Sequence, residues 1–348
     1  MRFFDVLVGA AAIGSALAAP AVDAPTPTVS KTSKRAGKKF QFLGVNESGA
    51  EFGNKDLPGT LGKHYTWPVH STIDTLVGKG FNTFRIPFMM ERLVPNKLDG
   101  PLNTVYAQGL EDIVKYVTSK GAYAIVDPHN FGRYYDKIIT DVAGFKAYWA
   151  TTAKAFAGNE KVIFDTNNEY HDMDNPLVQK LNQAAIDGIR AAGATKQYIF
   201  VEGNSWSGAW TWTSSGNGAS LKDLTDPSNK LIYEMHQYLD SDGSGTSATC
   251  VSATIGAERV KDATAWLKAN GKKGIIGEFA GGANTVCKSA VTGLLDHLEA
   301  NSDVWTGALW WGGGPWWGDG ATGYIFGYEP PSGTGYSYYN SLLQGYSP

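Results

Sequence analysis

Short apolar runs recur along the chain from residue 40 onward, and amphipathic stretches separate them. The runs are five to eight residues long and rich in β-branched and aromatic residues, a composition typical of buried strands. We predict eight strands, over residues 40–45, 81–88, 122–127, 162–166, 198–202, 231–235, 274–279 and 307–311.

The stretches between these runs show helical periodicity. In residues 104–120 four apolar positions fall on one face of a helix, namely Leu110, Ile113, Val114 and Val117. Several intervening segments stop at a glycine just before the next strand. Glycine is favoured just past a helix end because it adopts the left-handed conformation at little cost. The glycines in question are Gly80, Gly121, Gly193 and Gly271.

Eight strands alternating with helices over about 300 residues predict a single α/β domain folded as a (β/α)8 TIM barrel. An open doubly wound sheet is the competing interpretation. That fold would place a glycine-rich phosphate-binding turn after its first strand. The corresponding segment, NESGAEFGNKDLPG at 46–59, lacks the G-x-G-x-x-G pattern. No linker-like segment interrupts the alternation, so we expect one domain.

The N-terminus has the pattern of a secretory signal. A basic residue is followed by an apolar stretch from Val6 to Leu17 and by small residues suited to cleavage, which predicts a signal peptide over 1–18. The apolar stretch is too short to span a bilayer. Residues 19–35 are polar and rich in proline and end in a dibasic pair, as in a pro-segment. We therefore expect a secreted, extracellular protein whose mature domain covers 36–348.

Charge and cysteine content narrow the possible partners. The net charge of −3 gives no electrostatic reason to expect nucleic acid as a partner, and no membrane partner is expected once the signal is removed. The two cysteines, Cys250 and Cys287, form an even pair in a predicted secreted protein. A disulfide between them is expected, with two free thiols as the alternative.

Polar and aromatic side chains collect where the predicted strands end. The carboxyl ends of the strands form the active-site face of a TIM barrel. Residues in or directly after the eight strands include Asn46, Glu47, Arg85, Asp127, His129, Asn130, Asn167, Asn168, Glu169, Glu202, Asn204, Trp206, His236, Tyr238, Glu278, Trp310 and Trp311. The opposite ends carry ordinary turn residues, and this asymmetry indicates a functional face.

Tryptophans follow the same rule. Seven of the eleven end or follow two of the strands, and a tryptophan taken alone is more often a core residue. Flat apolar rings with polar neighbours suit the faces of pyranose rings. We expect this group to lie on the functional face: Trp206, Trp210, Trp212, Trp310, Trp311, Trp316 and Trp317.

Six dispersed motifs complete the pattern. They are RIPF at 85–88, DPHN at 127–130, NNEYHDM at 167–173, HQY at 236–238, GEFAGG at 277–282 and LWW at 309–311. In these motifs and their order the chain resembles glycoside hydrolase family 5, and within it the secreted fungal endo-β-1,4-glucanases, over about 40–345. One departure is visible, since Tyr170 stands where the family commonly has a proline after the glutamate.

The resemblance implies a retaining hydrolase of β-1,4-glucan that needs no cofactor and no metal. It implies that Glu169 is the general acid/base and Glu278 the nucleophile, a pair that retaining glycosidases hold close together. It also implies a supporting shell of Arg85, His129, Asn168, His236, Tyr238 and Trp311. Trp206 and Trp210 are predicted sugar platforms. We expect a monomer without an appended carbohydrate-binding module.

Several alternatives remain open at this point. By position alone, Glu202 and Glu234 also sit near strand ends and are not excluded from the catalytic pair. A metal-dependent barrel hydrolase is possible because His129, His171 and His236 all follow strands, and so is a sugar-binding barrel without activity. Within the family, β-mannan, xyloglucan and mixed-linkage glucan are alternative substrates.

Overall fold

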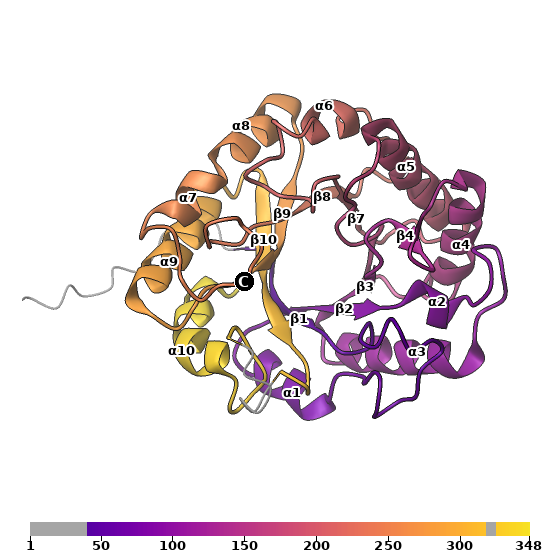
Figure 1. Ribbon diagram of the computed structural model, residues 1–348, viewed down its shortest axis with the longest axis horizontal. Helices are drawn as coiled ribbons and strands as arrows, with labels where there is room; N and C mark the ends of the chain where they lie inside the picture. The colour runs from indigo at the N-terminus through magenta and orange to yellow at the C-terminus, as the bar shows by residue number, and fades with distance from the viewer. Residues whose placement is uncertain (1–39, 318–324) are drawn as a thin grey trace, which may run out of the picture. The chain divides into compact units, whose positions relative to one another are not determined.

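Eight parallel strands close into a barrel, and helices surround it (Figure 1). The computed structural model describes residues 40–317 and 325–348, so the predicted signal peptide and pro-segment lie outside the described residues. The barrel strands are β1 (Phe42–Glu47), β2 (Thr83–Phe88), β3 (Tyr123–Pro128), β6 (Val162–Asp165), β7 (Ile199–Glu202), β8 (Leu231–His236), β9 (Gly274–Phe279) and β10 (Trp305–Gly313). Each pairs with its neighbours in the order β1-β10-β9-β8-β7-β6-β3-β2.

Helices follow the strands around the outside of the barrel (Figure 1). They are α1 (His70–Val77), α2 (Met90–Leu93), α3 (Thr104–Ser119), α4 (Val142–Lys154), α5 (Asn175–Ala191), α6 (Asn217–Leu221), α7 (Ile255–Arg259), α8 (Lys261–Asn270), α9 (Thr285–Ala300) and α10 (Thr334–Leu343), followed by a 3₁₀ turn at Gln344–Tyr346. A short antiparallel hairpin, β4 (Arg133–Tyr134) with β5 (Lys137–Ile138), lies in the loop after β3. Its two-residue strands are too short to leave a periodic signal in the sequence.

The predicted TIM barrel is confirmed. Every barrel strand begins and ends within two residues of its predicted range, and the helix predicted over 104–120 is α3. The four glycines expected to end helical segments all have left-handed backbones, with φ of 91° at Gly80, 82° at Gly121, 87° at Gly193 and 62° at Gly271. The sequence pattern therefore determines the order and the approximate bounds of the barrel strands.

The barrel interior is built in layers that follow strand alternation. One apolar layer takes a side chain from every barrel strand except β2: Phe42, Ile125, Ile163, Phe200, Ile232, Ile275 and Leu309. Successive side chains of a strand point to opposite faces, so the residue two positions further along points to the same side. Those positions carry Gly44, Asp127, Asp165, Glu202, Glu234, Gly277 and Trp311. A polar layer thus lies directly above the apolar one, toward the carboxyl ends of the strands.

Gly277 is required by this polar layer. A Cβ atom at this position would lie 1.6 Å from Oε1 of Glu234. The absence of a side chain on β9 therefore makes room for the carboxyl group of the neighbouring strand. Any larger residue at 277 would displace a fully buried carboxylate.

Two of the expected tryptophan placements are wrong. Trp212 and Trp310 are fully buried, and neither lies on an open face. The Trp310 indole donates to the carbonyl of Phe326 at 2.8 Å, and Trp212 packs edge-to-face on Tyr233. Trp310 and Trp311 are adjacent on one strand, so only one of them can face the barrel interior.

The predicted disulfide is confirmed, since Cys250 and Cys287 are bonded. It joins the loop after β8 to α9 and closes a loop of 37 residues. In the part of the chain that the structure describes, no helix is long and apolar enough to cross a membrane.

Candidate active site

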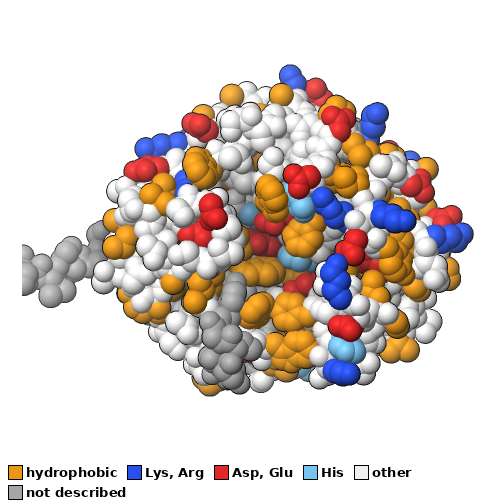
Figure 2. All heavy atoms as spheres, in the orientation of Figure 1, with side chains coloured by type: hydrophobic (Ala, Val, Ile, Leu, Met, Phe, Trp, Pro, Cys, Tyr) orange, Lys and Arg blue, Asp and Glu red, His pale blue; other side chains and the backbone are white. Residues whose placement is uncertain are grey.

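A cavity of about 640 Å³ opens at the carboxyl ends of the strands. Figure 2 shows a hollow near the middle of this face, with acidic side chains inside it and hydrophobic side chains at its border. Eight of the ten predicted catalytic and substrate-binding residues line the cavity: His129, Glu169, Trp206, Trp210, His236, Tyr238, Glu278 and Trp311. The other two, Arg85 and Asn168, are fully buried and lie in the polar network around it.

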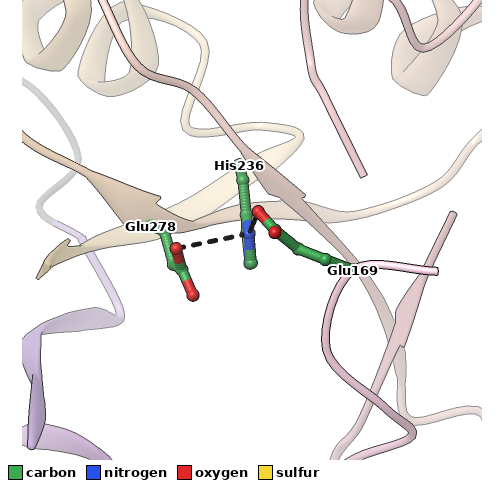
Figure 3. Close-up of side chains that lie close together, drawn as sticks. All are labelled: Glu169, His236 and Glu278. Carbon is green, nitrogen blue, oxygen red and sulfur yellow. Dashed lines mark hydrogen bonds and ion pairs between the residues drawn. The ribbon is translucent and has the colours of Figure 1, made fainter. Parts of the chain in front are cut away.

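Glu169 and Glu278 face each other across His236. The ring nitrogen Nδ1 of His236 lies 2.7 Å from Oε1 of Glu169 and 3.6 Å from Oε2 of Glu278 (Figure 3). One carboxylate oxygen of each glutamate and one ring nitrogen of the histidine lie within 4.8 Å of one another. The two carboxyl groups are therefore close together at the cavity.

Glu278 is held by donors on both oxygens. Nη1 of Arg85 donates to Oε1 at 2.9 Å, and the Tyr238 hydroxyl donates to Oε2 at 2.7 Å. Burial alone would raise the pKa of Glu278, but the positive charges of His236 and Arg85 and the hydroxyl donor outweigh burial. The pKa of Glu278 therefore lies below its ordinary value of 4.5. A lowered pKa favours the ionised carboxylate, which is the form that a nucleophile needs.

Arg85 is the centre of the polar layer. It is fully buried and pairs with five carboxylates. The nitrogen–oxygen distances are 3.1 Å to Asp127, 2.8 Å to Asp165, 3.2 Å to Glu202, 3.3 Å to Glu234 and 2.9 Å to Glu278. The arginine is therefore both a barrel-interior ion-pair residue and a direct partner of Glu278, roles that the sequence alone did not separate.

The carboxyl groups around Arg85 have different protonation behaviour. Burial raises the pKa of Asp127 to about 8. Burial also raises the pKa of Asp165 and of Glu202 well above the ordinary range, with the nearby carboxylates adding to the effect. Glu278, in contrast, has a lowered pKa. This separation favours Glu278 as the member of the cluster that stays ionised.

Burial also lowers the pKa of histidines, but His236 is an exception. The negative charges of Glu278 and Glu202 outweigh its burial, so the pKa of His236 is raised well above 6.5. His129 follows the usual rule, and burial holds its pKa below 6.5. The pKa values of the two histidines are therefore shifted in opposite directions, upward for His236 and downward for His129.

Two asparagines complete the surroundings of Arg85. Asn46 accepts from Nη1 of Arg85 at 3.0 Å and donates to the carbonyls of Gly277 and Trp310. Asn168 accepts from Nη2 at 2.8 Å, while its Nδ2 has no hydrogen-bond partner among the described residues. A buried amide donor costs free energy unless it finds a partner, so Nδ2 is a candidate donor to a ligand.

His129 and Trp311 form one wall of the cavity. Their rings stack with centroids 5.3 Å apart and an interplanar angle of 14°. Nδ1 of His129 lies 2.8 Å from Oδ2 of Asp127, which orients the ring. The predicted supporting shell is thus gathered around one position.

Trp206 and Trp210 also line the cavity and are about half exposed, at 51% and 48%. Each ring is backed by a second group. Trp206 stacks on His171 with centroids 4.7 Å apart, and the Arg259 guanidinium lies 4.3 Å from the ring centroid of Trp210. Exposed indoles held from behind present flat apolar faces to the cavity.

The metal-site alternative receives little support from the geometry. Two groups of residues in the described part of the chain have the ligand spacing for an ion: Glu169 with His236 and Glu278, and Glu202 with Glu234 and His236. In the first group the possible ligand atoms already have partners. The Glu169 carboxyl group pairs with His236, and the Glu278 carboxylate accepts hydrogen bonds from Arg85 and Tyr238. Neither group includes His129 or His171, whose ring nitrogens face Asp127 and Asp172.

Glu202 and Glu234, the other two carboxyl groups considered for the catalytic pair, differ from Glu169 and Glu278 in position. Glu202 and Glu234 are fully buried beneath the cavity and do not line it. Tyr170, which replaces the common proline, is fully buried, and its carbonyl accepts the Trp206 N–H at 3.1 Å. Asn167 accepts the Gly132 N–H and supports the loop.

Sequence reasoning missed two residues that shape the site. Asn46 was visible at the end of the first strand but carried no predicted role, although it holds Arg85. Gln237, inside the HQY motif, accepts the Trp210 N–H at 2.8 Å and fixes that tryptophan's backbone. The signals that could have found them were the position of Asn46 at a strand end and that of Gln237 within the HQY motif.

A family model described as cellulase (glycosyl hydrolase family 5) matches residues 43–314. The chain belongs to glycoside hydrolase family 5. The resemblance inferred from the dispersed motifs is thereby confirmed, and the match covers all eight strands except the first residue of β1.

Curated members of family 5 are similar over most of the chain. Endoglucanase gh5-1 of Neurospora crassa is 60% identical over 313 residues, which cover 90% of this chain and 79% of that protein. The probable endo-β-1,4-glucanase B of Neosartorya fischeri is 58% identical over 346 residues, 99% of each. Among solved structures, XacCel5A in complex with cellopentaose superimposes with a TM-score of 0.84 at 37% identity, covering 88% of this chain and 99% of that one.

Proposed function

We propose that this protein is a retaining endo-β-1,4-glucanase that cleaves internal bonds of cellulose and related β-glucans. The proposal rests chiefly on the closeness of Glu169 and Glu278, whose nearest oxygens lie within 4.8 Å at the cavity. Retaining glycosidases hold their carboxyl groups about 5–5.5 Å apart, whereas inverting enzymes leave about 6.5–9.5 Å for a water molecule. The names of the family members support the choice of bond.

In the first step, Glu278 attacks the anomeric carbon and the bond to the leaving sugar breaks. Glu169 gives its proton to the departing oxygen, so the leaving chain ends in a hydroxyl. A covalent glycosyl ester on Glu278 results. In the second step, Glu169 takes a proton from water, the water oxygen bonds to the anomeric carbon, and Glu278 is released as a carboxylate.

The surrounding groups have separate tasks in this scheme. Arg85 and Tyr238 keep Glu278 ionised and aimed. The unpartnered Nδ2 of Asn168 is placed to donate to the sugar 2-hydroxyl, a contact that strengthens in the transition state. Trp311 and His129 form the wall beside the same sugar.

The substrate is proposed to be a β-1,4-glucan chain bound along the cavity. Trp206 and Trp210 offer apolar faces beyond the catalytic pair, and the solved relative XacCel5A holds cellopentaose. Digestion of carboxymethylcellulose, mixed-linkage glucan, xyloglucan and β-mannan tests this choice. We expect the viscosity of carboxymethylcellulose to fall much faster than reducing ends appear. Activity on β-mannan alone would overturn the substrate.

Treatment with a chelator separates this proposal from a metal-dependent hydrolase. We expect full activity after prolonged incubation with EDTA, because the groups around Glu278 are protein side chains that already satisfy it. Loss of activity that returns on adding zinc or manganese would favour the metal-dependent alternative.

We also propose that the protein is secreted and acts as a monomer on its polysaccharide. The predicted signal peptide and dibasic pro-segment support secretion. N-terminal sequencing of protein from the culture medium of an expressing fungus should find a start near residue 36. Light scattering of the purified protein should give the mass of one chain.

A further inference from the structure

Glu169 has an unusual backbone for a residue that must be placed accurately. Its φ is 46°, in the left-handed region that costs free energy for any residue with a side chain. The residue follows β6 in the loop that carries Asn167 and Asn168. Something in the fold must therefore hold this conformation, because the backbone alone does not favour it.

The Glu202 carboxylate contacts this backbone directly. Its Oε2 accepts the Glu169 N–H at 2.7 Å, from the end of the neighbouring strand β7. The hydrogen bond is short and joins a buried carboxyl group to a backbone donor. It fixes the loop at the residue whose side chain enters the cavity.

The second oxygen of Glu202, Oε1, is linked to Glu169 through the His236 ring. Oε1 lies 3.2 Å from Nη2 of Arg85 and 3.6 Å from Nε2 of His236. The other ring nitrogen of His236 lies 2.7 Å from the Glu169 carboxylate. The Glu202 carboxyl group therefore contacts the backbone N–H of Glu169 with one oxygen. With the other oxygen it contacts the His236 ring, whose opposite nitrogen contacts the Glu169 side chain.

Glu202 takes no direct part in bond cleavage. Its side chain is fully buried beneath the cavity and does not line it. Its contacts are with Glu169, Arg85 and His236, all of which belong to the site. Its position and partners are those of a group that acts through another residue.

We propose that Glu202 is a positioning residue for Glu169, holding its backbone N–H and the His236 ring so that the Glu169 carboxyl points at the glycosidic oxygen. The inference rests on the proposed function, in which Glu169 donates the proton. It predicts that loss of the Glu202 acceptor impairs proton donation and leaves nucleophilic attack by Glu278 intact.

The test compares two substrates that differ in their need for a proton. Cellotetraose releases a sugar hydroxyl, which requires general acid catalysis. 2,4-Dinitrophenyl β-cellobioside releases a weakly basic phenolate that departs without a proton. Values of kcat/KM for both substrates report the first chemical step. The wild-type protein must hydrolyse cellotetraose, and failure there would contradict the proposed function itself.

Two variants remove the acceptor in different ways. Glu202→Met keeps the size of the side chain and removes its oxygens. Glu202→Asp keeps the carboxyl group and withdraws it by one methylene. For both we expect kcat/KM on cellotetraose to fall by about 10- to 100-fold, within the range of acid–base effects, and kcat/KM on the dinitrophenyl glycoside to change less than about threefold. Turnover of the dinitrophenyl glycoside also shows that each variant is folded.

A rescue and a control complete the design. Glu202→Gln retains an oxygen for the Glu169 N–H, so it should recover most of the activity on cellotetraose. Asp165→Leu removes a carboxylate from the same arginine without touching Glu169, and any loss should be similar on both substrates. Equal losses on both substrates in the Glu202 variants would overturn the proposal, and so would an unchanged rate on cellotetraose.

Discussion

The Tyr238 hydroxyl donates to Oε2 of Glu278 at 2.7 Å, on the oxygen that Arg85 does not contact. Tyr238 lies just beyond the end of β8 and Glu278 lies on β9, so the barrel itself sets their spacing. The hydrogen bond favours the ionised carboxylate and contributes to the lowered pKa of Glu278. Tyr238 therefore adds to the effect of His236 and Arg85 on the ionisation of Glu278.

Replacing Tyr238 with phenylalanine should move the acidic limb of the activity profile. Without the hydroxyl donor the pKa of Glu278 rises, so ionisation requires a higher pH and activity is lost earlier on acidification. A hydrogen bond to a charged group contributes about 1.5 kcal/mol or more, which corresponds to about one pH unit. The measurement is kcat/KM against pH.

Tyr233→Phe is a suitable control for that experiment. Tyr233 lies on the same strand, but its hydroxyl donates to the carbonyl of Leu221 outside the active site. Its acidic limb should match that of the wild type. A shift of equal size in both variants would show that the hydroxyl of Tyr238 has no special relation to Glu278.

Neutralising the two proposed catalytic glutamates should produce different defects. Glu278→Gln removes the nucleophile, and we expect kcat to fall by roughly four orders of magnitude on cello-oligosaccharides and on dinitrophenyl β-cellobioside alike. Glu169→Gln removes the acid, so the loss in kcat/KM should be large only for the cello-oligosaccharides. Retained hydrolysis of both substrates by Glu278→Gln would exclude that residue as nucleophile.

Trp206 and Trp212 offer a matched comparison between a platform and a core residue. Trp206 is 51% exposed at the cavity, so Trp206→Ala should raise KM by about three- to tenfold with kcat nearly unchanged. Trp212 is fully buried, so Trp212→Ala should lower the free energy of unfolding by about 3–5 kcal/mol. Steady-state kinetics and urea unfolding distinguish the two, and an unchanged KM in the first variant would remove Trp206 from substrate binding.

Buried carboxyl groups should make the fold less stable at alkaline pH. The pKa of Asp127 rises from 3.8 to about 8 on folding. The folded state therefore binds more protons than the unfolded state between these values. This stability is present below pH 3.8 and is lost as the pH rises through about 8. The pKa of His236 is also raised on folding, so this residue too contributes stability that is lost as the pH rises above the unfolded-state pKa of about 6.5.

The measurement is the thermal midpoint of unfolding across this pH range. We expect a decline from about pH 5 to about pH 8, and a smaller decline in Asp127→Asn, which has no carboxyl group to ionise. A decline of the same size in the variant would show that other groups account for the pH dependence.

The strands and their order were predictable because each is a short apolar run that ends in polar residues. Glu169 and Glu278 were located through family motifs, since position alone did not separate them from Glu202 and Glu234. The distinction depends on depth within the barrel, and the latter two are buried below the cavity. How deep a side chain lies within the barrel depends on how the strands are shifted relative to one another. This shift cannot be read from any single segment of the sequence.

The wrong placement of Trp310 has a similar explanation. Trp310 and Trp311 are adjacent on β10, and side chains alternate between the two faces of a strand. Trp311 therefore enters the cavity while Trp310 packs among the outer elements. The clustering of tryptophans in the sequence correctly indicated the end of the barrel at which they lie. It did not take into account that neighbouring side chains of a strand point to opposite faces.

The anomeric configuration of the first-formed product tests the central claim most directly. Proton NMR during hydrolysis of cellopentaose by a high concentration of enzyme resolves the two anomers before they interconvert. Retention through a covalent intermediate on Glu278 predicts that the β-anomer appears first and the α-anomer only later, by mutarotation. Initial appearance of the α-anomer would contradict the double displacement and the roles proposed for both glutamates.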